Sequence, residues 1–251
     1  MAHKAVHRLE DPQAGAGRYF RQMDMVGVEG QAKMKEAVVL VAGVGGLGGT
    51  AALYLAAAGI GKLILVHEGI TVLPDLNRQI LMSTEGIGRT RVDQAAESLA
   101  RLNPEVEIET WNGKVEADAV RPLVRRADLV IDARYDFPER YVLNRLCMDE
   151  GKPMVEAAMY GYEISLTTVV PGETPCLECL YPESPQVWEP LGFPVLGAVS
   201  GMAGCLAALE AIKRLLGKPG LAGKMLRFDS LNFQSVEFDV TGAPRCGHCG
   251  G

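Results

Sequence analysis

Short apolar runs alternate with helical patterns over roughly the first 160 residues of the chain. Five runs have strand length, and most are apolar throughout, as in strands buried on both faces of a parallel sheet. These runs cover residues 37–42, 62–67, 106–111, 127–132 and 153–158. Helical periodicity predicts helices over about 18–36, 50–59, 91–102, 117–126 and 139–150. This alternation is typical of a sheet built from βαβ units.

The pattern changes in the last third of the chain. Segments 163–170 and 226–240 have β character without crossover helices, and they flank an apolar helical segment at 193–216. We therefore predict an α/β fold: a Rossmann-like doubly wound sheet, mostly parallel, with a mixed β C-terminal half. No Ser/Gly/Pro-rich linker interrupts residues 18–251, so we expect a single domain there. Residues 1–17 are expected to form a flexible tail.

Segment 193–209 is apolar or small at every position except Ser200. Its length is short to marginal for a membrane span and charged residues follow it directly, so we predict a buried helix, for which a subunit interface is one candidate place. Residues 1–17 contain no apolar stretch of the kind that a signal peptide needs. The expected location is therefore the cytoplasm, where thiols stay reduced.

The amino-acid composition excludes some classes of protein. The chain has 251 residues, of which 48% are hydrophobic and 22% are charged, and this balance excludes a disordered or fibrous protein. The formal net charge is -6, so the chain is a poor candidate for non-specific binding to nucleic acid.

A glycine-rich segment follows the first predicted strand and opens a helix. Gly43, Gly45, Gly46 and Gly48 lie in it, and such a loop lets phosphate approach the N–H groups at a helix N-terminus. The alternative is a tight turn without a ligand. Glu68 ends the second strand, 20 residues after Gly48. An acid there binds ribose in dinucleotide enzymes, so an NAD-dependent oxidoreductase remains a weaker alternative.

The six cysteines divide into two groups. Four of them form two Cys-x-x-Cys pairs, Cys176 with Cys179 and Cys246 with Cys249, separated by 66 residues. Two such pairs predict a closed four-thiolate zinc site, which is structural because no coordination position is left open. The alternatives are two disulfides or a redox-active Cys-x-x-Cys motif. A redox-active motif normally opens a helix, and neither cysteine pair is expected to do so. The other two cysteines, Cys147 and Cys205, are predicted core residues.

Charged residues follow the predicted strands at the edge where a doubly wound sheet binds ligands. Arg78 comes shortly after the second strand, and Arg89 and Arg91 begin the next helix. Several arginines near a glycine loop suit a triphosphate better than a dinucleotide. Asp132 and Asp136 follow the strand at 127–132, and carboxylates beside a triphosphate typically hold Mg²⁺.

Taken together, these motifs resemble the ThiF/MoeB/HesA family, the bacterial relatives of ubiquitin-activating enzymes. The matching segments run in the family's order from about residue 18 to residue 249. They are Arg18-Tyr-Phe-Arg21-Gln22, the glycine loop, Leu76-Asn-Arg78-Gln79, Gly88-Arg-Thr-Arg91-Val, Asp132 with Arg140, Leu209-Glu-Ala-Ile-Lys213 and the two cysteine pairs.

The resemblance implies a homodimer that uses ATP and Mg²⁺ to adenylate a carboxyl group. The usual substrate is the C-terminal glycine of a ubiquitin-like sulfur-carrier protein, and a small carboxylic acid is the other candidate class. The four paired cysteines would hold a structural zinc ion. Nucleotide would be bound by the glycines of the loop and by Asp132. The phosphate site would be lined by Arg78, Gln79 and Arg91. Arg21 would act as an arginine finger in the partner subunit's site.

Several positions depart from the family pattern. His67 stands where a ribose-binding Asp is usual, although the adjacent Glu68 would be a substitute. Asp75 replaces an Asn and Arg91 replaces a Lys. The metal-binding Asp is replaced by Tyr135 or shifted to Asp136. These changes favour an alternative function, a catalytically silent or altered-ligand relative that binds nucleotide or a partner. No cysteine occurs in 181–200, so no enzyme thioester is expected.

Overall fold

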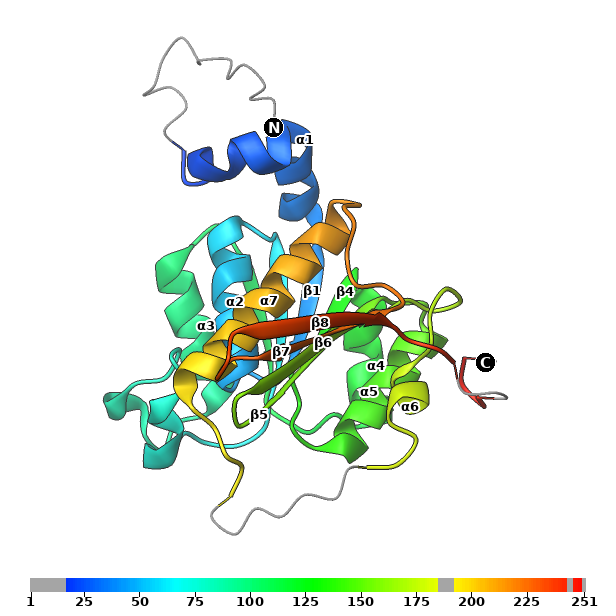
Figure 1. Ribbon diagram of the computed structural model, residues 1–251. Helices are drawn as coiled ribbons and strands as arrows, with labels where there is room; N and C mark the ends of the chain where they lie inside the picture. Colours follow the sequence, from blue (N-terminus) through cyan, green and yellow to red (C-terminus); the bar gives the residue numbers. More distant parts are fainter. Residues whose placement is uncertain (1–16, 185–191, 243–245, 250–251) are drawn as a thin grey trace.

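The computed structural model describes residues 17–184, 192–242 and 246–249. The predicted tail at 1–17 therefore lies almost wholly outside the described residues. The described strands form one eight-stranded sheet in the order β3-β2-β1-β4-β5-β6-β7-β8 (Figure 1). They are β1 Val38–Ala42, β2 Lys62–Val66, β3 Glu107–Trp111, β4 Leu129–Asp132, β5 Met154–Tyr160, β6 Glu163–Val169, β7 Lys224–Asp229 and β8 Gln234–Asp239.

The sheet has a parallel half and an antiparallel half. Strands β1 to β5 pair in parallel, and β5 pairs antiparallel with β6, which continues antiparallel through β7 to β8. The apolar runs at β1, β2 and β4 are buried almost throughout, because helices cover both faces of the parallel half. The predicted Rossmann-like sheet with a mixed C-terminal half is confirmed.

Most helices lie close to their predicted ranges, but α2 begins four residues before its predicted start and α6 was not predicted. They are α1 Met23–Glu36, α2 Gly46–Ala58, α3 Arg91–Leu102, α4 Ala117–Arg126, α5 Phe137–Asp149, α6 Leu177–Leu180 and α7 Gly197–Leu215, with 3-10 turns η1 Phe20–Gln22, η2 Leu73–Asn77 and η3 Thr84–Gly86. One difference is that the first helical segment begins as a 3-10 turn and is kinked at Gly27, where φ is 73°. Periodicity alone does not indicate a kink.

Helices α2, α3 and α7 contribute to the core on one face of the sheet, and α4 and α5 to the core on the other. A side chain at Gly204 on α7 would overlap the carbonyl oxygen of Leu47 on α2, so the small residues of α7 allow the two helices to approach closely. Among the described residues, no helix has both the length and the apolar character that a membrane span needs.

The prediction that both Cys147 and Cys205 lie in the core is wrong for Cys205. Cys147 on α5 is fully buried as expected, but Cys205 on α7 is exposed. Only one side of α7 packs against α2 and the sheet, where Ala203, Ala207 and Ala211 are buried. Cys205 lies on the opposite side, and an apolar sequence on both sides of a helix does not reveal which side is covered.

Candidate nucleotide site and four-cysteine cluster

The glycine loop connects β1 to α2 at the carboxyl end of the parallel strands. Gly43 has a φ of 103°, and a side chain there would come within 2.5 Å of the Ala133 carbonyl oxygen. A side chain at Gly48 would overlap the carbonyl oxygen of Gly43, and one at Gly46 would meet the Ser200 hydroxyl at 2.5 Å. Backbone contacts therefore require glycine at Gly43 and Gly48, whereas a side chain at Gly46 would displace the side chains of Ser200 and Arg78.

Gly45 differs from the other loop glycines. It is the N-cap residue of α2, and a side chain added there would meet only the Gln79 amide nitrogen, at 4.0 Å. Packing among the described residues does not account for glycine at this position. The first N–H groups of a helix have no partner within the helix, so an N-cap position without a side chain is suited to an approaching phosphate group.

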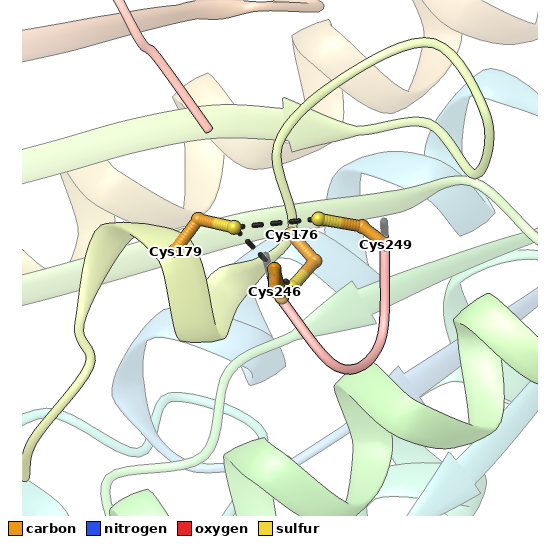
Figure 2. A group of neighbouring side chains, drawn as sticks. All are labelled: Cys176, Cys179, Cys246 and Cys249. Atoms are coloured by element: carbon orange, nitrogen blue, oxygen red, sulfur yellow. Dashed lines mark hydrogen bonds between the residues drawn. The ribbon is translucent and has the colours of Figure 1, made fainter. Parts of the chain in front are cut away.

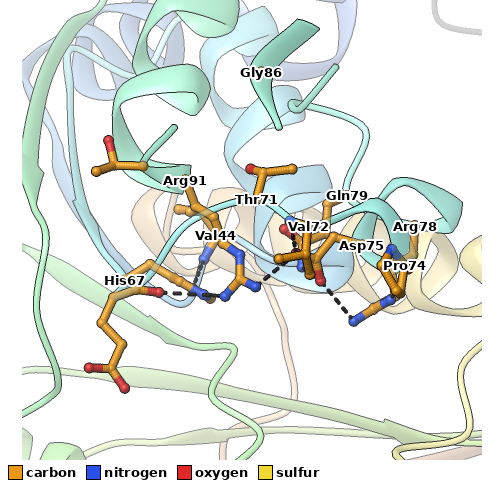
Figure 3. A network of polar contacts seen from close by, with 12 residues as sticks. Val44, His67, Thr71, Val72, Pro74, Asp75, Arg78, Gln79, Gly86 and Arg91 are labelled. Atoms are coloured by element: carbon orange, nitrogen blue, oxygen red, sulfur yellow. Dashed lines mark hydrogen bonds and ion pairs between the residues drawn. The ribbon is translucent and has the colours of Figure 1, made fainter. Parts of the chain in front are cut away.

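Asp75 is the centre of a network of predicted phosphate-binding residues (Figure 3). Its buried carboxylate lies within the short turn η2. Asp75 Oδ1 accepts hydrogen bonds from Gln79 Nε2 at 2.9 Å and Arg78 Nη2 at 3.3 Å. Asp75 Oδ2 accepts one from Arg91 Nη2 at 2.8 Å. The structure thus brings together around one acid three residues, Arg78, Gln79 and Arg91, that were assigned to the phosphate site.

His67 follows β2 and links this network to the glycine loop. Its Nδ1 accepts a hydrogen bond from the Val44 N–H at 2.9 Å. Arg91 Nη1 lies 3.0 Å from His67 Nε2 (Figure 3). Arg134 Nη1 lies 3.3 Å from His67 Nδ1. Burial, with the Arg134 and Arg91 charges, lowers the pKa of His67 to about 3. The imidazole is therefore neutral near pH 7.

Arg134 is not among the residues predicted from the sequence, although it lies at the strand-end edge two residues after Asp132. Its guanidinium is anchored by Glu139, with Nη2 2.6 Å from Oε1, and Glu139 Oε2 also accepts the Val115 N–H. The predicted ribose-binding alternative, Glu68, contacts this cluster only through its backbone carbonyl, which accepts from Arg91 Nη1 at 3.5 Å. Its side chain is 46% exposed, and it pairs with Lys114 at a distance of 3.8 Å.

Asp132 takes part in a buried ionic cluster beneath the loop. Its Oδ2 accepts from Arg140 Nε at 2.9 Å and its Oδ1 from the Arg134 backbone N–H at 3.1 Å. Arg140 also pairs with Glu156, and all three side chains are almost fully buried. Strand register places Asp132 directly beside Glu156. Glu156 is a second residue that the sequence did not predict, and its signal is a charge inside an apolar strand run.

Several buried polar atoms in this region have no partner within the described residues. Those next to the glycine loop are Gln79 Oε1, Arg91 Nε and Arg134 Nε, and Glu156 Oε2 lies in the ionic cluster below. Buried polar atoms in folded proteins are almost always paired, so their concentration here indicates a ligand site.

Two further predicted residues lie outside the cluster. Asp136 is partly buried at the N-cap position of α5, four residues beyond Asp132. Arg21 is exposed on η1, whose neighbour Gln22 donates to the carbonyl of Ala58, the last residue of α2. Because α2 has 13 residues and is about 20 Å long, Arg21 lies far from the glycine loop at its other end.

The two cysteine pairs converge on one site (Figure 2). The four sulfur atoms all lie within 4.8 Å of one another, with separations that include 3.7 Å for Cys176–Cys246 and 3.3 Å for Cys179–Cys249. A tetrahedral zinc ion with bonds of about 2.3 Å has sulfur–sulfur edges of about 3.8 Å. The donor set and its spacing therefore fit Zn²⁺, and the sulfur separations exceed a disulfide bond of about 2.05 Å.

The environment favours the thiolate at Cys246, whereas burial raises the pKa of Cys176 to about 12. The N–H groups of Cys249 and His248 lower the pKa of Cys246 to about 6. Glu178 pairs with Arg145 at 2.8 Å and with His248 at 3.0 Å, which connects the two knuckles. Cys176 is the N-cap of the one-turn helix α6, so the expectation that neither pair opens a helix was wrong for this pair.

Comparison with known proteins places this geometry in a family. Residues 19–249 match the model of the ThiF family. The chain is 48% identical over 236 residues to a heterocyst HesA protein of Trichormus variabilis, covering 93% of this chain and 88% of the relative. It is 38% identical over 244 residues to a SAMP-activating enzyme E1 of Haloferax volcanii, with the same coverage of each.

Solved structures agree on the fold. E. coli MccB with bound ATP superimposes with a TM-score of 0.83 at 23% identity, covering 94% of this chain and 74% of MccB. MccB in complex with N-formylated MccA superimposes with a TM-score of 0.85 at 22% identity, covering 94% of this chain and 76% of MccB. Since the family model spans nearly the whole chain and its relatives match along most of their own length, this chain belongs to the ThiF family.

Proposed function

We propose that this chain is an adenylyltransferase, which uses ATP to activate a carboxyl group without forming a thioester on its own cysteines. The observation that carries the proposal is the convergence of Arg78, Gln79 and Arg91 on Asp75, beside the open space at Gly45. A glycine loop with fixed guanidinium groups next to it suits a triphosphate.

The residues present fit ATP in two respects. The space at Gly45 is free of side chains among the described residues except for the Gln79 amide at 4.0 Å, and Arg91 Nε and Gln79 Oε1 are buried without partners among the described residues. A phosphate oxygen would accept from Arg91 Nε, and a hydroxyl or amino group of the nucleotide would donate to Gln79 Oε1. We assign Gly43, Gly45, Gly46 and Gly48 to the phosphate-binding turn, with Gln79 beside it.

For Mg²⁺, the donor set favours Asp136 over Asp132. Both Asp132 oxygens already accept hydrogen bonds, and the side chain is fully buried. Asp136 is partly exposed and offers the oxygen ligands that Mg²⁺ prefers. When bound, Mg²⁺ would offset charge on the phosphate oxygens.

The proposed reaction joins a carboxylate oxygen to the α-phosphorus of ATP and breaks the bond to the leaving pyrophosphate. Both reactants are anions, so their approach and the departure of pyrophosphate need positive charge held in place beforehand. Arg78 and Arg91 each share Asp75 as an anchor, which orients the two guanidinium groups and limits their freedom. Asp75 thus positions the cations that bind phosphate.

The proposal also includes a second subunit and a class of substrate. Arg21 lies about one α2 length from the loop of its own chain, so it would act only in the site of a second copy in a homodimer. The Haloferax relative is named a SAMP-activating enzyme E1, and a Zea mays relative an adenylyltransferase and sulfurtransferase. These names support a ubiquitin-like sulfur-carrier protein as substrate, with a small carboxylic acid as the other class. We also assign a structural zinc ion to the four-cysteine cluster.

The test is exchange of labelled pyrophosphate into ATP by the full chain, with sulfur-carrier proteins ending in Gly-Gly and with small carboxylic acids. We expect exchange with one class and its loss in Arg78→Ala. The matched control is Arg89→Ala, because Arg89 is half exposed and pairs with Glu97 on the surface. Absence of ATP binding by calorimetry would overturn the proposal.

A second candidate, a nucleotide-binding protein without turnover, is favoured by one observation. Tyr135, where the family has its metal-binding Asp, is 72% exposed and offers no carboxylate. ATP binding that is intact in calorimetry, without pyrophosphate exchange for any carboxylate tested, would support this candidate over the first.

A further inference from the structure

The end of β2 is the place where a nucleotide on the glycine loop presents its sugar. In doubly wound folds an acid at this position hydrogen-bonds the ribose hydroxyls, whereas an arginine nearby accommodates a phosphate on the ribose. In this chain the position holds His67, and the nearest acid in sequence, Glu68, is half exposed with Lys114 beside it. Within the described part of the chain, the sugar position therefore has arginines on either side in place of an acid.

Hydrogen-bond donors face one another around His67. The Val44 N–H donates to Nδ1, so the proton of the neutral ring is on Nε2. Arg91 Nη1 lies 3.0 Å from that nitrogen and is itself a donor. Two donors at this distance are mutually unfavourable, and an acceptor that both can reach would relieve the conflict.

Two more donors in the same place have no partner among the described residues. Arg91 Nε and Arg134 Nε are both buried, and the Arg134 side chain is only 8% exposed. Arg78, Arg91 and Arg134 contribute three positive charges, against the two negative charges of Asp75 and Glu139 to which they are anchored. Since His67 is neutral, Asp75 and Glu139 balance Arg91 and Arg134, and the neighbouring Arg78 leaves one net positive charge among these side chains.

We propose that His67, Arg91 and Arg134 form a subsite for a tetrahedral oxyanion, carried as a phosphate on the ribose of the nucleotide. The inference rests on nucleotide binding at the glycine loop, as in the proposed function, but not on adenylation. A free inorganic oxyanion beside an ordinary nucleotide presents the same chemistry, and the experiment separates these two sources.

The test compares ligands that share a 5′-phosphate and differ only at the sugar. Calorimetry of the full chain is done with AMP, adenosine 2′,5′-bisphosphate and adenosine 3′,5′-bisphosphate. We expect one bisphosphate to bind about tenfold or more tightly than AMP, because the added dianion gains charge-assisted hydrogen bonds. A second series titrates AMP in sodium sulfate and in sodium chloride of equal ionic strength. Tighter AMP binding in sulfate alone, without a preference for either bisphosphate, identifies the free anion as the source.

Variants connect either effect to the subsite. Arg134→Gln and His67→Asp are expected to abolish the preference for the oxyanion, and His67→Asp restores an acid at the sugar position. Glu68→Gln is the matched control and should keep the preference. It changes only the half-exposed side chain that pairs with Lys114 and leaves the Glu68 carbonyl, which accepts from Arg91 Nη1, in place. Thermal unfolding of each variant verifies that it is folded.

A second readout does not depend on affinity. The His67 ring resonances, assigned by comparison with His67→Gln among the chain's four histidines, should report a higher pKa with the oxyanion bound than with AMP alone. Equal affinity for AMP and both bisphosphates, with no effect of sulfate, would overturn this inference while leaving the proposed function intact. Failure of ATP and all these nucleotides to bind would overturn both.

Discussion

Arg91 donates a hydrogen bond through Nη2 to Asp75 Oδ2 at 2.8 Å, and the other end of the same guanidinium reaches His67. These are three of the positions that depart from the family pattern, and they form one connected network. The position of His67 lacks the usual acid, and the position of Asp75 has an acid where an Asn is usual. An arginine spans the two positions, whereas the shorter lysine ammonium has a single point of charge.

Asp75→Asn is expected to destabilise the protein by about 1–3 kcal/mol, because Arg78 and Arg91 would lose the carboxylate on which both are anchored. Urea unfolding monitored by fluorescence measures the effect. Glu97→Gln, which removes one partner of an exposed pair with Arg89, is the control and should change stability by less than about 0.5 kcal/mol. Equal effects of the two variants would contradict the central role of Asp75.

A double-mutant cycle tests whether the departures are coupled. Asp75→Asn and Arg91→Lys together should cost less than the sum of their separate costs, with an interaction energy of about 0.5–3 kcal/mol. The same unfolding measurement applies to all four proteins. Strict additivity would show that the two side chains act independently.

His67 should make stability depend on pH on the acid side of neutrality. Its folded pKa of about 3 lies below the ordinary value of 6.5, so the unfolded chain binds the proton more readily. Stability is therefore fully present above pH 6.5 and is lost as pH falls from there toward 3. Between pH 7 and 5 we expect the wild type to lose up to about 2 kcal/mol more than His67→Gln, measured by urea unfolding. Parallel pH profiles would contradict the prediction.

Glu156 should make the stability of the protein depend on pH in the opposite direction. Burial raises the pKa of Glu156, and nearby Asp132 adds to this effect while Arg140 opposes it. A raised folded pKa contributes stability that is present below the unfolded value of about 4.5 and is lost as pH rises through the folded value. Glu156→Gln should thus gain stability relative to wild type between about pH 4.5 and 7, measured by urea unfolding.

Arg140→Met provides the contrasting change in the same cluster. It leaves Asp132 and Glu156 buried without their shared cation, and loss of one partner of a buried pair costs about 3–5 kcal/mol. A gain in Glu156→Gln with a loss in Arg140→Met would establish that the cluster holds one carboxylate too many for its single arginine.

The metal prediction is tested by elemental analysis. The purified chain should contain about one zinc ion per molecule, and Cys249→Ser should lose it together with thermal stability. Cys205→Ser is the matched control, because Cys205 lies on the exposed face of α7 and should retain the metal. Retention of zinc in Cys249→Ser would place the ion elsewhere.

Most of the fold was accessible from the sequence because buried parallel strands are apolar throughout and their crossover helices are periodic. Helix α3 matches its predicted range at both ends, and Gly59 caps α2 in the left-handed conformation as expected of a C-cap glycine. The two strands in the 226–240 segment were expected only as β structure. Their antiparallel pairing depends on long-range contacts that a local pattern does not contain.

The site was less predictable than the fold. Position along the chain indicated Arg78 and Arg91, and the family resemblance indicated Gln79. Neither indicated that the three meet at Asp75, because that contact requires the turn η2 to lie beside α3. Asp132 was predicted as a nucleotide ligand, yet its two oxygens are occupied by Arg140 and the Arg134 N–H. The role of a strand-end acid depends on neighbours from other strands and helices, which a single sequence does not specify.

The four-cysteine cluster can be completed only late in the synthesis of the protein. Cys176 and Cys179 leave the ribosome before the 66 residues that include α7, β7 and β8, and only then do Cys246 and Cys249 follow. At about 5–20 residues per second, the first pair waits on the nascent chain for about 3–13 s as a half-site. Binding of the proposed zinc ion by all four cysteines would therefore be a late event, after the parallel strands of the sheet have been translated.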